Sequence, residues 1–471
     1  MLLEGLDVCE ISLSELLFHN DVFRVDAEYF GKAALRVINR LHAISAVPLA
    51  SLATITDGIH TSLPFVEDGE VKVLSAKHPK ENYIDRSGFE TVTAKFHSLN
   101  PRTALRENDV LISTVGTIGN SAVVTSDLLP ANSDRHIGIV RLNGADMSPY
   151  FLSTFLLGCY GRTQSNRETT GNVQPNLFIS KIGQILVPRF SSAFETKITK
   201  LVEIAYRQRE SAAGHLLSGE TKLLHALGLD NWQAPEPLSY VRSSRDAFAA
   251  GRFDAEYFYP AKTAALATLT QLSDSTIGDL FESVRNLWQP ADGQPAELVR
   301  NYDLTDALSP FLDGGKEAVA RESIASTKKT IVAGDLVVSR LRSYLKEIAI
   351  VQPGGETPMV ASTEFIVLRP KTSLVPVEAL LIYLRSTLPQ LVFKWSQDGS
   401  NHPRFDEQEL LRLPIPKALI AHANDYIVAV QSMISARQRA TQLLEAAKRA
   451  VEIAIENSES AALAYLAEVD Q

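Results

Sequence analysis

The chain has 471 residues and a formal net charge of −9, and 45% of its residues are apolar while 21% are charged. This balance is typical of a globular protein with several domains and excludes a disordered, fibrous or disulfide-rich chain. The negative charge also argues against a protein that coats nucleic acid with a wholly basic surface. It still permits a binder whose cations are gathered on one face.

Neither a membrane span nor an export signal is expected. The longest nearly apolar stretch, residues 151–161, is too short to cross a bilayer. The start of the chain has no lysine or arginine before Arg24, so it lacks the basic region of a signal peptide. Cys9 and Cys159 have neither metal-ligand spacing nor a disulfide framework. We therefore expect a cytoplasmic protein with no membrane partner.

One pentapeptide, DAEYF, occurs twice, at 26–30 and 254–258, which is an offset of 228 positions (254 − 26). Other landmarks recur at this offset or within two residues of it, and a single long period with small shifts predicts a duplicated domain. We expect the aromatic residues of the pentapeptide to pack against their own domain. The further pairs are Gly171 with Gly399, Pro175 with Pro403, Pro188 with Pro416, and Asp109 with Asp335.

In chain order, the first half opens with β-branched runs bounded by turn-forming residues. These runs predict strands at 71–76, 109–115, 121–125 and 137–142. A helix over 148–159, a loop rich in Gly, Asn and Pro, and a short strand ending at Pro188 follow. Apolar residues at steps of three, four and seven then predict a long helix within 191–230.

The second half repeats this order. Residues 229–252, with two prolines and mixed charge, predict a connection between the halves. Strands are expected at 328–334, 335–341, 347–352 and 364–369, then a helix over 376–387 and a long helix within 419–471. Arg437 and Thr441 interrupt the apolar seam of that last helix.

The expected fold class is α+β, with two pseudo-symmetric domains joined by two long antiparallel helices that form a coiled-coil spacer. A helix of about 30 residues spans roughly 45 Å. The expected boundaries are 1–190 for the first domain, 191–230 for the first spacer helix, 231–418 for the second domain and 419–471 for the second spacer helix.

Nearly the whole chain resembles the specificity (S) subunit of a type I restriction–modification system. The resemblance rests on the two-fold repeat and on three motifs: DGIHTSLPFVEDGEVKVLSAK at 57–77, DVLISTVGTIGNSAVV at 109–124, and GNVQPNLFISKIGQILVP at 171–188 before a long helix. It implies two target-recognition domains, each of which reads one part of a split, asymmetric site in double-stranded DNA.

The same resemblance implies partners. The paired helices set the distance between the recognition domains and bind two modification subunits, which use S-adenosylmethionine to methylate adenine. Two restriction subunits, which need ATP and Mg, can join to cut DNA. The S subunit itself is not catalytic and binds no cofactor.

Polar side chains in the predicted loops of the first half suit contacts with DNA. Asn and Gln can bond bidentately to adenine, Gly-rich turns let backbone amides approach a phosphate, and cations attract the duplex. Turn formation and solvated charge are the alternative roles for the same residues. The candidates are His60, Thr61, Lys77, His78, Thr117, Asn120, Arg135, Asn172, Gln174 and Asn176.

The second half departs from the first at these loops, with RSYLKE in place of GTIGN and SNHPR in place of NVQPN. These departures predict two different half-sites and leave open which residues of the second half contact bases. Arginine and lysine there suit guanine or phosphate. The candidates are Arg340, Arg342, Lys346, Asn401, His402 and Arg404.

Two other functions compete with DNA recognition. A protein-interaction scaffold without a DNA role, two β-rich domains on a helical stalk, agrees with the negative net charge. A Mg-dependent nuclease would need Asp57, Glu70 and Lys72 to converge on one metal site. The sequence has no phosphate-binding loop of the G-x-x-x-x-G-K-[ST] type and no Gly-rich loop suited to S-adenosylmethionine.

Overall fold

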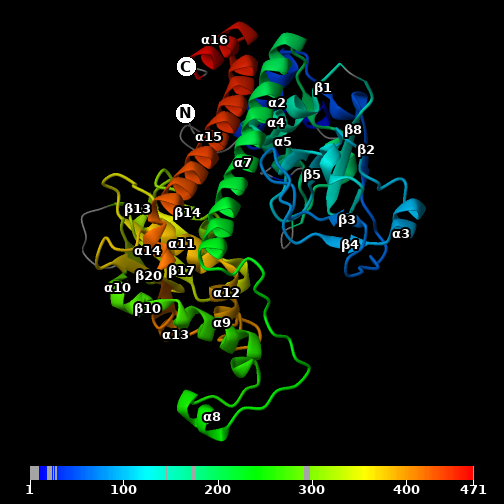
Figure 1. Cartoon of the computed structure of the whole chain (residues 1–471). Helices are drawn as coiled ribbons and strands as arrows, with labels where there is room; N and C mark the ends of the chain where they lie inside the picture. The colour runs from blue at the N-terminus through cyan, green and yellow to red at the C-terminus, as the bar shows by residue number, and fades with distance from the viewer. Residues whose placement is uncertain are drawn as a thin grey trace. The chain divides into compact units, whose positions relative to one another are not determined.

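The computed structural model describes residues 10–18, 24, 26, 29–144, 146–171, 175–290 and 297–469 (Figure 1). The chain forms two compact units: unit 1 is Met1–Arg209 with Gln438–Gln471, and unit 2 is Glu210–Arg437. The expected domains follow one another along the chain, whereas unit 1 takes in the C-terminal end. The reason is that the long helices α7 (Ser192–Ala226) and α15 (Ala423–Glu456) each contribute residues to both units.

The described part of unit 1 contains two small sheets and one two-stranded pair. β2, β8, β5 and β6 lie in this order in an antiparallel sheet, and β3 lies between β4 and β7 in the other, parallel to β7. β1 pairs with β9. The strands are β1 (Val47–Pro48), β2 (Ala53–Asp57), β3 (Val71–Leu74), β4 (Glu90–Val92), β5 (Val110–Ser113), β6 (Ser121–Val123), β7 (Ala131–Ser133), β8 (Ile137–Leu142) and β9 (Leu186–Val187).

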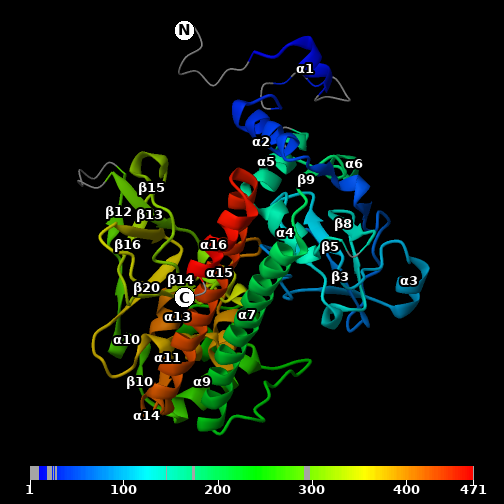
Figure 2. The ribbon, with the colours of Figure 1, turned by 90° about the horizontal axis from the view of Figure 1, so that it is seen from above.

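Helices cover these sheets, and Figure 2 shows α2 beside α5. The start of α4 follows from its sequence, because the Ser148 hydroxyl accepts a hydrogen bond from the Phe151 amide and Pro149 occupies the first turn. The helices of unit 1 besides the long ones are α1 (Leu13–Phe18), α2 (Lys32–Ala43), α3 (Ala94–Leu99), α4 (Pro149–Leu157), α5 (Cys159–Glu168), α6 (Ile179–Ile182) and α16 (Glu459–Val469).

Unit 2 has larger sheets. Their strand orders are β11-β20-β17-β18-β14 and β12-β16-β19-β13-β15, and β10 pairs with β21. The strands are β10 (Ser273–Thr276), β11 (Phe281–Val284), β12 (Leu287–Trp288), β13 (Leu298–Tyr302), β14 (Phe311–Leu312), β15 (Val319–Ala320), β16 (Lys328–Ile331), β17 (Leu336–Ser339), β18 (Ile348–Val351), β19 (Met359–Ser362), β20 (Phe365–Pro370) and β21 (Pro414–Pro416). The shorter helices are α8 (Ser244–Ala250), α9 (Pro260–Gln271), α10 (Ile277–Leu280), α11 (Val377–Arg385), α12 (Thr387–Lys394), α13 (Glu407–Leu411) and α14 (Ala418–Ala421).

The two units repeat one topology, which confirms the internal duplication. The order β2-β8-β5-β6 of unit 1 returns as β11-β20-β17-β18, and the parallel pair β3–β7 returns as β13–β19. The register is kept as well: Ile55 pairs with Val140, and Ser283 pairs with Leu368, each shifted by 228 positions. Unit 2 adds β14 to one sheet and β12 and β16 to the other, in which β15 pairs with β13 as β4 pairs with β3.

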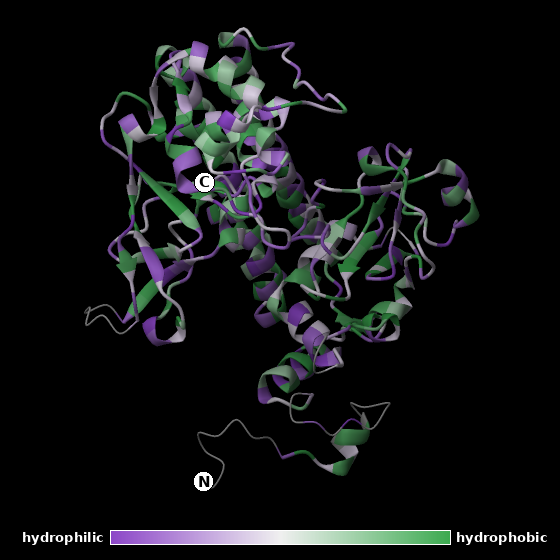
Figure 3. Cartoon of the chain, turned by 90° about the horizontal axis from the view of Figure 1, so that it is seen from below, coloured by the Kyte–Doolittle hydropathy of each residue, from purple (hydrophilic) through white to green (hydrophobic). Residues whose placement is uncertain are grey.

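Each unit has its own apolar core, built from sheet, helix and parts of the two long helices. In Figure 3 the strands of the sheets are mostly green, as expected for strands buried on their faces. In unit 1, Phe194, Ile198 and Leu201 from the start of α7 share a core with Ala447 and Val451 from the later part of α15. In unit 2 the order is reversed, and Leu223 near the end of α7 shares a core with Val430 and Met433 near the start of α15.

The DAEYF repeat forms the same latch in each unit. Asp26 accepts a hydrogen bond from the Tyr29 amide at 3.0 Å, and Asp254 accepts one from the Tyr257 amide at 3.2 Å. The arginine two residues before each aspartate, Arg24 or Arg252, pairs with that aspartate. It also donates to backbone carbonyls just past α5 in unit 1 and past α12 in unit 2. These bonds therefore join the segment before α2 to the end of α5 in unit 1. In unit 2 they join the segment before α9 to the residues after α12.

A buried ion pair also recurs. Arg141 contacts Asp109 at 2.6 Å and Arg369 contacts Asp335 at 2.8 Å, and both aspartates are 1% exposed. Each aspartate also accepts a backbone amide of the turn before its strand, from Arg106 in unit 1 and from Val332 in unit 2. These bonds fix the turn that enters the central strand of each sheet. Among the described residues, no helix is both long and apolar enough to cross a membrane.

We predict that Asp109→Ala lowers the free energy of unfolding by about 3 kcal/mol, because it leaves the partly buried Arg141 without its partner. The measurement is urea unfolding of the full chain. Asp127→Ala is the control, since Asp127 pairs with Arg86 at an exposed position and its loss should cost less than about 1 kcal/mol. Equal losses for the two variants would contradict the role given to the buried pair.

Candidate nucleic-acid interface

A short loop closed by two backbone hydrogen bonds occurs in both units and is called here the bridged loop, residues 170–176 and 398–404. Thr170 and Asn176 exchange their amide–carbonyl bonds at 3.1 and 2.9 Å, and Asp398 and Arg404 do so at 2.8 and 2.9 Å. The residue after the first bridge position is glycine in each case, Gly171 with φ of 102° and Gly399 with φ of 92°. Glycine is required there because other residues are strained at such φ values.

The residue that follows each bridged loop bonds through its backbone to a second segment, and this second segment bonds to a third. The Leu177 amide donates to the Thr114 carbonyl at 3.0 Å, and the Thr114 amide donates to the His136 carbonyl at 3.1 Å. In unit 2 the Phe405 amide donates to the Arg340 carbonyl at 3.1 Å, and the Arg340 amide donates to the Glu364 carbonyl at 3.2 Å. The same three positions therefore meet in both units. They are called here the matched positions, 114, 136 and 176 in unit 1 and 340, 364 and 404 in unit 2.

In unit 1 the matched positions line a cavity of about 390 Å³. Three predicted residues, His60, Arg135 and Asn176, lie on its wall, so the structure brings together side chains that are far apart in the sequence. The full lining is Asp57, His60, Thr114, Val115, Arg135, His136, Asn176, Leu177, Phe178 and Ile179.

Asp57 organises one side of this cavity. Its carboxylate accepts a hydrogen bond from Arg102 at 2.8 Å and pairs with His60. Burial raises the pKa of Asp57, but the hydrogen bonds from Arg102 and His60 outweigh it and hold that pKa below its ordinary value. The His60 side chain is still 59% exposed. Its ring is therefore oriented by Asp57 and open to solvent.

The other side of the cavity is the turn 133–136. The His136 amide donates to Asp134 at 2.9 Å, and Arg135 Nε lies 3.1 Å from His136 Nε2. Burial raises the pKa of Asp134. Gly58 packs directly on this turn, since a Cβ there would lie 2.0 Å from the Asp134 carbonyl oxygen. Close approach, and not only turn formation, thus explains the glycine next to Asp57.

In unit 2 the matched positions carry charged side chains. Glu364 accepts hydrogen bonds from Arg340 Nε at 3.1 Å and from Arg404 Nη2 at 2.7 Å. The bonds from Arg404 and then Arg340 hold the pKa of Glu364 below its ordinary value. The side chains of Arg340 and Arg404 are 43% and 39% exposed. The cluster is ordered by its own ion pairs and remains accessible.

Other predicted residues of unit 2 surround this cluster. Asn401 and His402 are exposed on the bridged loop. The Arg342 amide donates to the Pro403 carbonyl at 2.9 Å, and its guanidinium lies 3.3 Å from His402 Nδ1. Lys346 is different, because its Nζ donates to the Arg385 carbonyl at 2.9 Å at the end of α11. Its ammonium group therefore holds a helix end and is not a free cation.

Two predicted residues of unit 1 are buried, and we correct those predictions. His78 is 1% exposed and its Nδ1 accepts the Ser75 amide at 2.8 Å, while burial lowers its pKa. Asn120 is 7% exposed, and its amide group bonds to the Pro79 carbonyl and to Arg162. Both side chains serve the fold, because a buried polar group needs partners within the protein.

The remaining predicted residues of unit 1 are exposed or lie outside the described part. Thr61, Lys77 and Thr117 are exposed and do not line the cavity. Lys77 donates to the Gly88 carbonyl at 3.2 Å. Asn172 and Gln174 lie outside the described residues.

Sequence reasoning missed Arg102 and Glu364 as parts of these surfaces. Arg102 comes from a loop far from the motifs, and no pattern in the sequence marks it. The repeat offset did hold the other signal, since 228 positions after His136 is Glu364 and 228 after Asn176 is Arg404. The 228-residue offset, applied residue by residue, therefore predicts which side chains of unit 2 occupy the places of His136 and Asn176.

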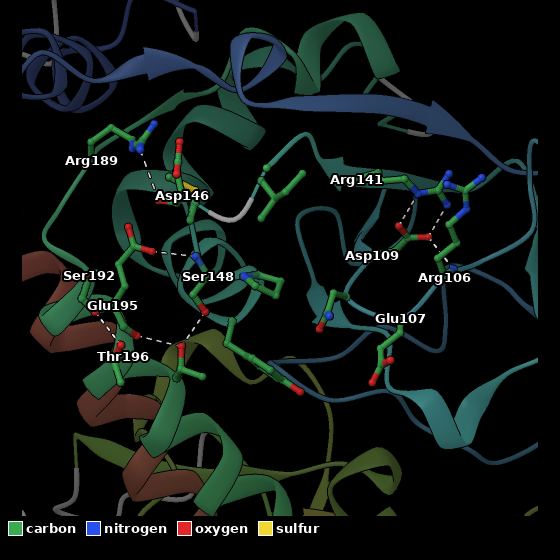
Figure 4. A pocket seen from close by; sticks show the side chains of 17 residues that line it. Arg106, Glu107, Asp109, Arg141, Asp146, Ser148, Arg189, Ser192, Glu195 and Thr196 are labelled. Carbon is green, nitrogen blue, oxygen red and sulfur yellow. Dashed lines mark hydrogen bonds and ion pairs between the residues drawn. The ribbon is translucent and has the colours of Figure 1, made fainter.

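A larger cavity of about 840 Å³ in unit 1 contains none of the predicted residues in its lining (Figure 4). Its polar groups serve the fold. Glu195 accepts the Ser148 amide at 2.8 Å at the start of α4, and the Ser148 hydroxyl bonds to Thr199 at 2.6 Å. Burial raises the pKa of Glu195. These hydrogen bonds join the start of α4 to α7, and the lining of the cavity contains none of the matched positions.

The residues that a magnesium site would need have separate partners. Asp57 binds Arg102 and His60, Glu70 accepts the Ala94 amide at 3.2 Å, and Lys72 donates to the Leu128 carbonyl at 3.2 Å. Among the described residues, no three acidic, histidine or cysteine side chains are grouped as metal ligands.

No protein-family model and no curated protein matches this chain. Among solved structures, it is similar to the S subunit of a type I restriction–modification system from M. genitalium, with 13% identity, a TM-score of 0.36, and coverage of 89% of this chain and 95% of that one. It is also similar to the HsdS subunit from Thermoanaerobacter tengcongensis, with 13% identity, a TM-score of 0.28, and coverage of 88% and 96%. A third similar structure comes from work on complex assembly and conformational transition of the type I R-M system, with 14% identity, a TM-score of 0.27, and coverage of 88% and 95%.

We predict that Gly171→Ala and Gly399→Ala each loosen the bridged loop, because a Cβ at these φ values costs about 1–3 kcal/mol. Amide hydrogen exchange should become faster at Asn176 in the first variant and at Arg404 in the second. Gly214→Ala is the control: it lies within α7 with open space around its Cβ position, so the change should stabilise the helix slightly. Unchanged exchange at both loops would argue against the strain.

Proposed function

We propose that this chain is the sequence-specific DNA-recognition subunit of a type I restriction–modification complex and reads a bipartite, asymmetric site. One observation carries the proposal. A duplicated scaffold presents the same matched positions twice but equips them with different hydrogen-bonding groups, Thr114, His136 and Asn176 in one unit and Arg340, Glu364 and Arg404 in the other. Two copies of one reader with different side chains suit two different half-sites.

The side chains at these surfaces suit base edges and phosphates. Asn176 can bond bidentately to adenine, and Arg340 and Arg404 to guanine. His60 and Arg135 in unit 1, and Arg342, Asn401 and His402 in unit 2, are placed to add contacts to bases or to the backbone. The net charge of −9 is compatible with this, since binding needs cations only at the face that meets the duplex.

The partners follow from the same proposal. The chain would bind double-stranded DNA and two modification subunits that carry S-adenosylmethionine, and two restriction subunits with ATP and Mg could join. It would itself be non-catalytic, bind no cofactor and act in the cytoplasm. One of the similar structures concerns complex assembly of the type I R-M system, and the partners proposed for this chain are of that kind.

The long helices would act as the spacer between the recognition domains. Their support is that α7 and α15 contribute to the cores of both units in opposite order, as an antiparallel pair would. Two readers held about one turn of DNA apart, on the order of 34 Å, can each reach a major groove on the same side of a duplex. The length of the unread DNA spacer would then depend on helix length.

A protein-interaction scaffold is the second candidate, and one observation favours it. In the connection between the halves and the residue that follows it, Leu238, Val241, Phe248 and Phe253 are each at least 71% exposed. Exposed apolar side chains of this kind mark contacts with other proteins. A scaffold of this type would bind DNA without sequence preference or not at all.

We predict that exchange of residues 31–190 for the corresponding domain of a related chain changes one half of the recognised site and leaves the other half unchanged. The reason is that each unit would read its half-site with its own side chains. Methylome sequencing of cells that carry the native or exchanged gene measures this result. A site that changes in both halves, or cells whose methylation does not depend on the gene, would contradict the proposal.

We also predict that removal of one helical turn from each of α7 and α15 shortens the unread spacer of the recognised site. Each turn corresponds to about 5.4 Å of helix, which is more than one base-pair step of DNA. The same sequencing measures the spacer. The control is removal of residues from the exposed connection 233–242, which should leave the spacer unchanged; an unchanged spacer in the helix variant would count against the role of the helices.

A further inference from the structure

Glu364 joins two arginine side chains at the matched positions of unit 2. Arg404 Nε lies 3.1 Å from Oε1 and 3.0 Å from Oε2 of the Glu364 carboxylate, and Arg404 Nη2 lies 2.7 Å from Oε1. The carboxylate contacts Arg340 only through Nε, at 3.1 Å. Among the described residues, the terminal nitrogens of Arg340 make no hydrogen bond, and the side chain is 43% exposed. Arg340 Nη1 and Nη2 are thus free to donate two parallel hydrogen bonds, while Nε is held by Glu364.

We propose that unit 2 recognises guanine through Arg340, and that Glu364, which Arg404 holds in place, is the positioning residue that orients the Arg340 guanidinium. This inference rests on the proposed function and names the base that one of the two half-sites contains. The match is chemical: guanine presents two acceptors, O6 and N7, in the major groove, and a guanidinium fork offers two parallel donors.

The Glu364 carboxylate favours guanine over phosphate as the ligand of this cluster. A site for DNA phosphate gains from bare cations, whereas Glu364 places a negative charge between the two arginines and would repel a phosphate at the same spot. A base edge carries no net charge, so that repulsion is much weaker there. What a base edge requires is fixed donor geometry, and ion pairs to a buttressing carboxylate provide it by reducing the conformational freedom of long side chains.

The loop around the cluster is fixed in the same way. Arg404 Nη1 donates to the His402 carbonyl at 3.0 Å, and the Arg404 backbone closes the bridged loop with Asp398. The Phe405 amide bonds to the Arg340 carbonyl, so both arginines are anchored through the backbone as well as through Glu364. In unit 1 the corresponding residues are Thr114, His136 and Asn176, which offer no guanidinium fork. The preference for guanine that arises at the matched positions should therefore belong to one half-site only.

The test is selection from a random double-stranded DNA library, long enough for two half-sites and their spacer, by the purified full chain and its variants. Arg340→Lys keeps the positive charge and the link to Glu364 but loses the fork, and Arg404→Lys weakens the support of Glu364. If Arg340 reads guanine, Arg340→Lys should lose about tenfold or more of the preference for G·C at one position of one half-site, and Arg404→Lys should lose part of it. The other half-site should be selected as before, which also shows that the variants are folded.

Glu364→Gln separates positioning from simple folding. It removes a negative charge from a DNA-facing cluster, so binding to non-specific DNA should be unchanged or tighter while the G·C preference falls. A residue needed only for folding would weaken all binding together. Arg412→Ala is the matched control, because Arg412 is an exposed arginine of the same unit at the end of α13 and its loss should leave the selected sequence unchanged.

The outcomes are distinct. Arg340→Ala and Arg404→Ala would show phosphate contacts if they weaken binding equally on all sequences and reduce its dependence on salt, and if lysine restores binding. That result would overturn this inference but not the proposed function. Lysine variants that keep the full G·C preference would also overturn this inference alone. A native chain that selects no sequence at all would overturn the proposed function and this inference together.

Discussion

Backbone hydrogen bonds hold together the three chain segments on which both polar surfaces are built. In each unit the bridged loop bonds to the end of the central strand, and this strand end bonds to the start of the neighbouring strand. Amides and carbonyls are common to nearly every residue, so these bonds place no demand on the side chains at the matched positions. The scaffold can therefore stay the same while its surface chemistry differs. Asn176 and Arg404 occupy one place in two copies of one fold.

Around this constraint, the parts that both copies retain are those that fix geometry. The ion pairs Asp109–Arg141 and Asp335–Arg369 close the turn before the central strand, and the arginine–aspartate latch of each DAEYF segment fastens the helical layer. Glycine returns at 171 and 399 because the bridged loop needs a backbone conformation that side chains resist. Residues that are the same in both halves thus hold the fold in place, whereas the residues that differ at the matched positions lie on the surface that can meet a ligand.

The charge of the surfaces is subtler than a count of basic residues suggests. Arg102 is engaged by Asp57, Arg404 by Glu364 and Lys346 by a helix end. Long cationic side chains that are tied to carboxylates lose much of their attraction for a distant duplex but gain fixed direction. These surfaces are therefore suited to hydrogen bonding at short range, and less to gathering polyanions from solution. The overall charge of −9 is consistent with such a protein.

The sequence by itself determined the duplication, its 228-residue offset, the central strands and two helices, because apolar periodicity and repeated landmarks are local signals. The helices predicted over 148–159 and 376–387 are α4 and α11 of the structure. The sequence also pointed to His60, Arg135, Asn176, Arg340 and Arg404. Only the tertiary structure decided that His60, Arg135 and Asn176 line one cavity and that Glu364 orders Arg340 and Arg404. It also decided that His78 and Asn120 are buried. The structure also shows that each long helix contributes residues to the cores of both units. Burial and partnership depend on contacts between segments far apart in the chain, and no local pattern of residues encodes which segments meet.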